Sequence, residues 1–139
     1  MCGIVGYIGK NEAVPFLLQG LEKLEYRGYD SSGIAVYADR KIKLAKKQGR
    51  LKVLEDLLAS ESKISSHLGI GHTRWATHGN PSDINAHPHL SSSGKIALIH
   101  NGIIENYMEL KEKLISEGFD NFISDTDTEV AVQLLDYFY

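Results

Sequence analysis

The sequence has a single cysteine, only three prolines and no long apolar run among its 139 residues. One cysteine, Cys2, excludes an internal disulfide framework and a zinc site built from several cysteines. No stretch approaches the roughly 18 consecutive apolar residues of a membrane-spanning helix, and no signal-peptide pattern opens the chain. These absences predict a chain that works in a reducing, cytoplasmic setting without a membrane partner.

The chain also lacks a strong charge of either sign, because 15 Lys and Arg residues face 18 Asp and Glu residues. The resulting net charge of −3 argues against nucleic acid as the main partner. Apolar residues make up 42% and charged residues 24%, as in an ordinary globular protein. The length predicts one domain over residues 1–139.

Hydrophobic spacing predicts a mixed order of strands and helices. Strands are expected at 3–9, 34–38, 41–47, 68–75, 95–100 and 119–123, with a hairpin turn at Asp39-Arg40. Helices are expected at 12–25, 51–59, 103–117 and from Thr126 onward, where Thr126 and Glu129 make a capping-box pattern. The long polar segment 77–94 is typical of a functional loop. This order favours an α+β fold with antiparallel pairing.

Cys2 directly after Met1 is the sharpest single feature. Removal of Met1 would leave a thiol and a free α-amine on one residue. Such an amine exchanges its proton near neutral pH and can help to form a thiolate nucleophile. If Met1 is retained, the same nitrogen is an amide and cannot act as a base. Position alone leaves an inert second residue as the alternative.

Asn101, Gly102 and Asp127 stand where a strand ends and where a helix begins. The Asn101 amide and the Gly102 N–H could both point at a developing oxyanion, although Asn-Gly is also a common hairpin turn. Asp127 could hold a substrate ammonium, or it could simply complement the dipole of the final helix.

Arg74, Trp75, Thr77 and His78 lie where a strand gives way to the long polar segment. The planar fork of an arginine binds a carboxylate through two parallel hydrogen bonds. The alternative is a surface arginine at a strand end beside a core tryptophan.

His87 and His89 stand two residues apart on an extended segment and so face one side of it. Together with His78 or His100 they could ligate a metal ion. No carboxylate stands at a diagnostic spacing, and the sequence has no H-E-x-x-H motif. We therefore favour hydrogen bonds that shape the loop, and we expect neither a metal nor an organic cofactor.

Taken together, six blocks resemble the class II glutamine amidotransferases, which are N-terminal-nucleophile hydrolases, and among them the glutamine–fructose-6-phosphate aminotransferase family. The blocks are MCGIVGYIG, LEYRGYDSSGIA, HTRWATHG, NAHPH, HNGIIENY and SDTDTE, in this order. The resemblance implies a four-layer α/β/β/α sandwich of two antiparallel sheets. It also implies hydrolysis of L-glutamine to glutamate and ammonia, with the ammonia used in the full-length parent to make glucosamine 6-phosphate from fructose 6-phosphate.

The same resemblance implies a role for each matching residue. Cys2 attacks the side-chain amide of glutamine and forms a γ-glutamyl thioester. Asn101 and Gly102 form the oxyanion hole. Arg74 holds the α-carboxylate of glutamine, and Asp127 holds its α-amino group.

Four further residues take supporting roles by resemblance. Thr77 and His78 line the pocket on a loop that closes over the substrate. Trp75 lies where ammonia leaves toward the partner domain. Arg27 supports the catalytic terminus.

The implied partners are L-glutamine, the sugar isomerase domain of the full-length enzyme and a second copy of the chain. The sequence stops short of the family's full glutaminase domain, so we expect a sandwich that is incomplete at its C-terminus and a final helix with an uncovered apolar side. Two alternatives stay open. The chain could be an inactive or glutamine-binding fragment that keeps Met1, or the glutaminase part of another class II enzyme such as amidophosphoribosyltransferase or asparagine synthetase.

Overall fold

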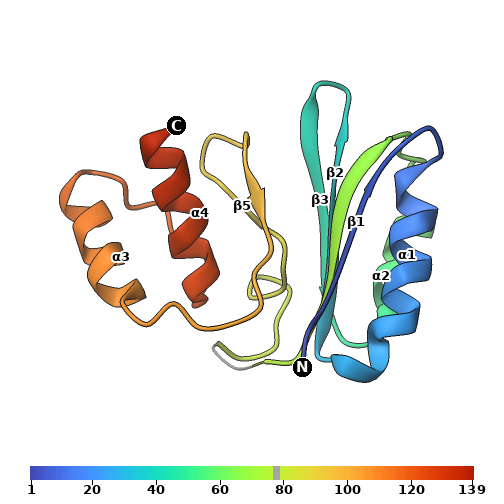
Figure 1. The fold of residues 1–139 in the computed structure, drawn as a ribbon, viewed down its shortest axis with the longest axis horizontal. Helices are drawn as coiled ribbons and strands as arrows, with labels where there is room; N and C mark the ends of the chain where they lie inside the picture. The colour runs from blue at the N-terminus through green and yellow to red at the C-terminus, as the bar shows by residue number, and fades with distance from the viewer. Residues whose placement is uncertain (77–78) are drawn as a thin grey trace.

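Four layers of secondary structure lie side by side in the order helices, sheet, sheet, helices (Figure 1). The computed structural model describes residues 1–76 and 79–139. The helices are α1 (Ala13–Leu24), α2 (Leu51–Ser60), α3 (Tyr107–Ser116) and α4 (Asp127–Phe138). Helices α1 and α2 form one outer layer, and α3 and α4 form the other. This arrangement confirms the expected α+β class and the α/β/β/α order.

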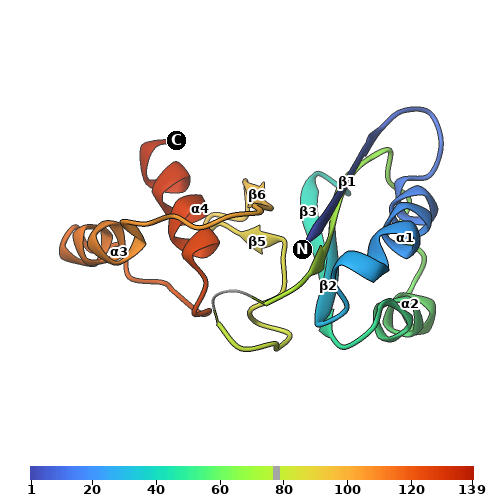
Figure 2. The same ribbon diagram turned by 60° about the horizontal axis from the view of Figure 1, so that its bottom comes forward.

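Two antiparallel sheets form the inner layers. The larger sheet has the strand order β1-β4-β2-β3, and its strands are β1 (Gly3–Ile8), β2 (Ser31–Ala38), β3 (Lys41–Gln48) and β4 (Leu68–Arg74). The smaller sheet pairs β5 (His89–Leu90) with β6 (Ala97–Leu98). Figure 2 shows the smaller sheet between the larger one and α4.

The expected hairpin between β2 and β3 is confirmed. Its turn residues Asp39 and Arg40 have φ values of 54° and 63°. Positive φ at both central residues gives a turn whose twist matches that of the two strands. Strand β3, whose sequence alternates lysines with apolar residues, lies at the edge of the sheet.

The apolar core lies between the larger sheet and the helices α1 and α2. It contains Ala13, Leu17, Leu21, Ile34, Val36, Ala45, Leu51 and Leu54. The four-residue spacing of Leu17 and Leu21 places both on one face of α1. Pro15 lies in the first turn of that helix, where its missing N–H costs no hydrogen bond.

Strand β4 presents different residues to its two faces. A Cβ atom on Gly71 would lie 3.2 Å from the Leu21 side chain, so Gly71 faces α1. Because side chains alternate along a strand, His72 and Arg74 share one face and Gly71 and Thr73 share the other. The glycines thus let α1 approach the sheet, while His72 and Arg74 point toward the second sheet.

The segment before β5 packs tightly onto the larger sheet. A Cβ atom on Gly33 of β2 would collide with the carbonyl oxygen of His87. Beside it, the ammonium of Lys46 on β3 donates to the carbonyls of Ile84, Ala86 and Pro88, at 3.1, 2.8 and 3.3 Å. These contacts join the two sheets.

Two elements begin three or more residues away from the predicted position, because nearby residues take other hydrogen bonds. Helix α3 begins at Tyr107 rather than at 103, since the N–H of Ile104 donates to the Asp127 carboxylate at 2.7 Å. Strand β2 begins at Ser31 rather than at 34, because Ser31 already pairs with both β3 and β4.

The strand predicted over 119–123 is wrong. Gly118 follows α3 with a φ of 82°, and the N–H of Phe119 turns back to the carbonyl of Leu114 at 2.8 Å. The N–H of Phe122 bonds to Asp120 at 3.0 Å. These local bonds replace the pairing that a strand needs. Strand β6 is also shorter than the predicted 95–100, and β5 lies in the segment expected to be a loop.

Helix α4 begins as predicted, with Thr126 as its N-cap. The Thr126 hydroxyl accepts from the N–H of Glu129 at 3.3 Å. The Glu129 carboxylate binds the N–H groups of Ile123 and Ser124 instead of closing the capping box on Thr126. The last turn is uncovered, with Phe138 72% exposed. Of the helices in the described ranges, none is long and apolar enough to span a membrane.

The contact between Gly33 and His87 can be tested with a matched pair of glycine substitutions. Gly33→Ala forces the His87 backbone off the sheet and should lower the free energy of unfolding by about 1–3 kcal/mol. Gly6→Ala in β1, where a Cβ meets no described atom within 4 Å, should change it by less than about 0.5 kcal/mol. Urea unfolding of both variants measures the difference, and equal stabilities would contradict the tight approach.

Candidate functional site

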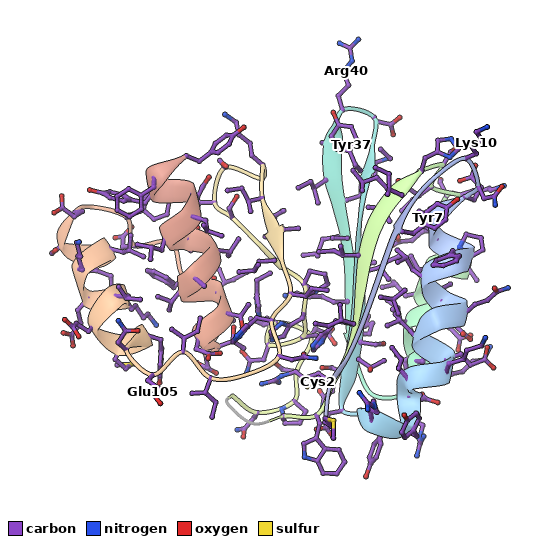
Figure 3. All side chains as sticks on the ribbon, viewed as in Figure 1. Cys2, Tyr7, Lys10, Tyr37, Arg40 and Glu105 are labelled. Atoms are coloured by element: carbon purple, nitrogen blue, oxygen red, sulfur yellow. The ribbon has the colours of Figure 1, made fainter. Side chains whose placement is uncertain are left out.

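A cavity of about 370 Å³ opens at one end of the sandwich, where the first residues of the chain meet the end of β4 and the start of α4. Six of the predicted catalytic and substrate-binding residues line it: Cys2, Arg74, Trp75, Asn101, Gly102 and Asp127. Figure 3 shows Cys2 at the end of the sheet opposite to Arg40 and the β2–β3 turn. Residues up to 125 positions apart in the sequence therefore meet at one place.

Cys2 is held by the backbone that follows β4. Strand β1 pairs with β4, and Gly3 lies opposite Thr73, so Cys2 is carried next to Trp75. The N–H of Trp75 donates to the Cys2 sulfur at 3.2 Å. The thiol is partly exposed and faces the cavity. It is therefore accessible to a small molecule.

The Asn101 side chain contacts the backbone of Cys2. Its Nδ2 donates to the carbonyl of Cys2 at 3.2 Å, and its Oδ1 lies 2.8 Å from Nε2 of His72. Gly102 has a φ of 140°, which side-chain-bearing residues rarely adopt. Asn101 and Gly102 form no hairpin turn here, because β6 ends at Leu98 and a loop toward α3 follows.

Arg74 and Asp127 place opposite charges in the same cavity. The Arg74 guanidinium is buried and donates to the carbonyl of Gly79 at 2.9 Å. Burial lowers the pKa of Arg74, while the nearby Cys2, Asp30 and Asp127 oppose that shift. Asp127 is also buried, and its Oδ2 accepts from Ile104. A ligand that carries both a carboxylate and an ammonium would complement this pair.

The remaining predicted residues are placed differently. Trp75 is 44% exposed, and its ring meets that of Tyr29 edge to face at 5.4 Å. Arg27 lies in the short 3-10 helix η1 (Glu25–Arg27), where its Nε donates to the Tyr26 hydroxyl at 3.1 Å. Among the residues described, Arg27 does not line the cavity. Thr77 and His78 lie outside the described residues.

A cluster of buried histidines stands behind the cavity, and one member was missed at the sequence level. The rings of His72 and His87 stack 4.4 Å apart, and His89 meets His87 edge to face at 4.7 Å. His89 Nε2 lies 2.8 Å from the Thr126 hydroxyl, in line with the expectation of hydrogen bonds that shape the loop. The available signal for His72 was its position two residues before Arg74 in a strand, which puts both on one face.

The histidine cluster is neutral. Burial lowers the pKa of His72 to about 4, and burial beside other cationic groups lowers the pKa values of His87 and His89 further. The described part of the chain contains no group of three His, Cys, Asp or Glu side chains arranged to hold a metal. His100 and the cluster member His87 both line the Cys2 cavity.

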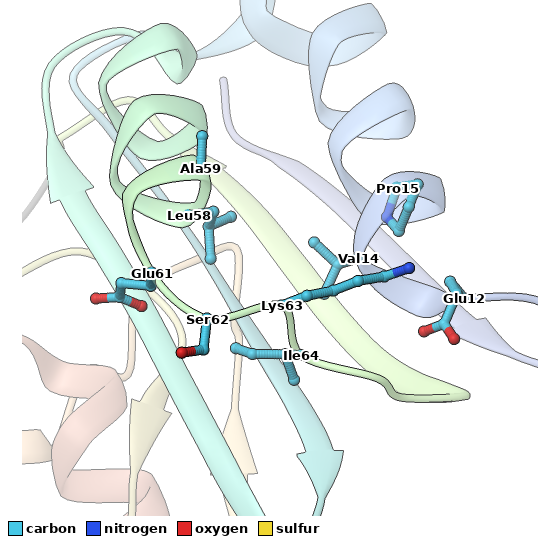
Figure 4. A pocket seen from close by; sticks show the side chains of 9 residues that line it. All are labelled: Glu12, Val14, Pro15, Leu58, Ala59, Glu61, Ser62, Lys63 and Ile64. Carbon is cyan, nitrogen blue, oxygen red and sulfur yellow. The ribbon is translucent and has the colours of Figure 1, made fainter.

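A second hollow, of about 290 Å³, lies on the helix-covered side of the larger sheet (Figure 4). Val14 and Leu58 give it apolar walls. Its acidic side chain Glu12 already accepts hydrogen bonds from Ser65 and Ser66. None of the predicted site residues lines this hollow, whereas Cys2, Arg74 and Asp127 line the cavity described above.

Known proteins resemble this chain in sequence. A family model described as a glutamine amidotransferase domain matches residues 58–138. The chain is 61% identical over 139 residues to the glutamine–fructose-6-phosphate aminotransferase (isomerizing) of Caldanaerobacter subterraneus subsp. tengcongensis. It is also 61% identical over 139 residues to that of Clostridium tetani. In both cases the match covers 100% of this chain and 22% of the relative's length.

Two solved structures share the fold. The glutamine phosphoribosylpyrophosphate amidotransferase of B. subtilis, complexed with ADP and GMP, superimposes with a TM-score of 0.80 at 31% sequence identity. A structure described as the allosteric regulatory enzyme of purine biosynthesis gives 0.82 at 32% identity. Each match covers 98% of this chain and 29% of the other.

The neutral histidine cluster predicts acid sensitivity. Lowered pKa values mean that the unfolded chain binds protons before the folded one does, so stability is complete above about pH 6.5 and falls below it by up to about 1.4 kcal/mol per pH unit for each histidine. For His72 the fall ends near pH 4. Urea unfolding across this range should show a shallower fall for His89→Gln, and an unchanged slope would contradict the neutral state of His89.

Proposed function

The chain belongs to the glutamine amidotransferase domain family, and on this premise we propose that it hydrolyses L-glutamine to glutamate and ammonia with Cys2 as the nucleophile. The observation that supports this most is the meeting of Cys2, Asn101, Arg74 and Asp127 in one cavity. These side chains offer a thiol, an amide donor, a cation and an anion. Free glutamine presents the complementary groups: a reactive amide, a carboxylate and an ammonium.

The reaction begins when the Cys2 thiolate attacks the side-chain carbonyl carbon of glutamine. The carbonyl oxygen becomes an oxyanion, which Asn101 Nδ2 and the N–H of Gly102 stabilise. The α-amine of Cys2, free once Met1 has been removed, takes the thiol proton and returns it to the departing ammonia. A γ-glutamyl thioester remains. Water, deprotonated by the same amine, then attacks it and releases glutamate and the thiol.

Substrate selection follows from the two charges. Arg74 binds the α-carboxylate and Asp127 binds the α-ammonium, which fixes the distance from the α-carbon to the thiol. Asparagine is one methylene shorter, so its amide does not reach Cys2 while its α-groups are held. A site with buried polar partners rejects ligands that leave them unpaired.

We propose supporting roles for the other predicted residues. Trp75 borders the cavity mouth on the path by which ammonia leaves. Thr77 and His78 close over bound glutamine. Arg27 supports the terminus through the short helix η1 rather than by contact with the cavity.

The chain spans 22% of the length of the curated relatives that it matches, so the activity of a whole enzyme is a further proposal. We infer that residues 1–139 form part of a glutaminase domain. In the full-length protein, ammonia would pass to an isomerase domain that converts fructose 6-phosphate to glucosamine 6-phosphate, in a cytoplasmic homodimer. The 61% identity to such enzymes, against 31% to the phosphoribosylpyrophosphate amidotransferase, supports this parent.

The form of the chain that retains Met1 gives the same site a second state. Its side chain lines the cavity and is 75% exposed. While Met1 is attached, the Cys2 nitrogen is an amide without a basic lone pair. This form would bind glutamine without hydrolysing it.

We expect Arg74 to act through the two parallel hydrogen bonds of its planar guanidinium group, and not through its charge alone. Arg74→Lys loses the two-point contact with the carboxylate and should raise KM for glutamine by about 30- to 100-fold, as expected for a lost charge-assisted hydrogen bond. Arg40→Lys, at the exposed tip of the β2–β3 hairpin, is the matched control and should leave KM unchanged. Glutamate release measured against glutamine concentration decides, and an unchanged KM for Arg74→Lys removes Arg74 from the site.

The nucleophile can be identified by intact mass. We expect a chain that has lost Met1 to gain one adduct from an electrophilic glutamine analogue, and free glutamine to block that gain. Cys2→Ala should abolish both the adduct and glutamate release, while still binding glutamine. A chain without Met1 that gains no adduct argues against the proposed chemistry.

A further inference from the structure

His72 is the buried histidine that touches the catalytic machinery. It is fully buried in β4, on the face that points toward the second sheet. Its Nε2 lies 2.8 Å from Oδ1 of Asn101. No part of the reaction described above uses this side chain. We propose that His72 is a positioning residue, whose Nε2–H fixes the Asn101 amide with its Nδ2 toward the oxyanion.

The direction of this hydrogen bond follows from the groups on both sides of Asn101. Nδ2 of Asn101 donates to the carbonyl of Cys2 at 3.2 Å. A flipped amide would turn Oδ1 against that carbonyl oxygen, and two acceptors would repel each other. With Nδ2 toward Cys2, Oδ1 must face His72. An acceptor facing Nε2 requires the proton on Nε2.

The other ring nitrogen supports the same tautomer. Nδ1 of His72 is buried and has no hydrogen-bond partner among residues 1–76 and 79–139. A proton on Nδ1 would leave an unpaired buried donor there and two lone pairs facing each other at Nε2 and Oδ1. Both are costly in a dry interior. With the proton on Nε2, the only unpaired group of the ring is the acceptor nitrogen Nδ1.

The ring itself is held in place. His87 stacks on His72 with an interplanar angle of 22°, and the His87 backbone is pressed against Gly33. Burial keeps the His72 ring neutral, with a pKa of about 4, so no charge draws water to it near neutral pH. His72 therefore presents one donor in a fixed position.

This role matters because a free asparagine side chain can rotate and flip. Asn101 is exposed on the cavity side, where bulk water competes for its amide. A donor held in advance at the developing charge stabilises the transition state without reorganisation. His72 would therefore affect the rate of the chemical step more than the affinity for glutamine, which Arg74 and Asp127 set.

Kinetics on the full-length protein test this inference, which rests on the proposed glutaminase activity. His72→Phe keeps the stacking shape and removes the donor, and it should lower kcat about 10- to 100-fold while KM changes less than about threefold. His72→Gln restores an N–H and should recover much of kcat. His67→Phe, a surface histidine before β4, is the control and should behave as the wild type.

A double-mutant cycle separates positioning from a general structural effect. Once Asn101→Ala has removed the amide, His72→Phe should cost less than about threefold more in kcat, because coupled residues are non-additive. An equal loss of kcat in both backgrounds overturns the inference, as does a raised KM with unchanged kcat.

The tautomer gives a readout that does not depend on activity. The imidazole ¹⁵N spectrum of the wild-type protein at neutral pH should show His72 protonated on Nε2. Protonation on Nδ1 overturns the positioning role even in an active enzyme. If the wild-type protein has no glutaminase activity, that result contradicts the proposed function. The tautomer of His72 then still tests whether the Asn101 amide is oriented as inferred.

Discussion

The close packing of the segment 84–88 onto the larger sheet is the constraint on which the rest of the structure depends. Gly33 has no side chain, so the His87 backbone reaches β2, and Lys46 ties three carbonyls of this segment to β3. Burial lowers the pKa of Lys46 to about 8, yet its donors remain paired. The contact places the His87 ring on His72. It therefore helps to hold the second sheet in place against the larger sheet.

Polar groups, rather than an apolar core, fill the space between the sheets next to the cavity. His72 reaches Asn101 on one side of the cluster, and His89 reaches Thr126 on the other. Thr126 caps α4, whose first residue is Asp127. One buried network therefore links the proposed oxyanion donor to the proposed ammonium site.

Much of this fold could be predicted from the sequence because the signals were local. The leucine spacing of α1, the turn residues Asp39-Arg40, the Thr126 cap and the Gly118 stop each act within a few residues. The prediction failed where a segment takes hydrogen-bond partners that its residue types do not indicate. The segment 119–123 has strand-like residues but bonds locally. Helix α3 starts late because Asp127, far along the chain, takes the N–H of Ile104.

The same distinction between local and distant signals applies to the candidate site. By itself, the sequence determined which chemical groups are available: a thiol beside the N-terminus at Cys2, an arginine at a strand end, an Asn-Gly pair and an acid at a helix start. Only the tertiary structure decided that these groups share one cavity and that His72 stands behind Asn101. The physical reason is that antiparallel pairing and sheet packing join residues separated by most of the chain, and such contacts leave no periodic mark in the sequence.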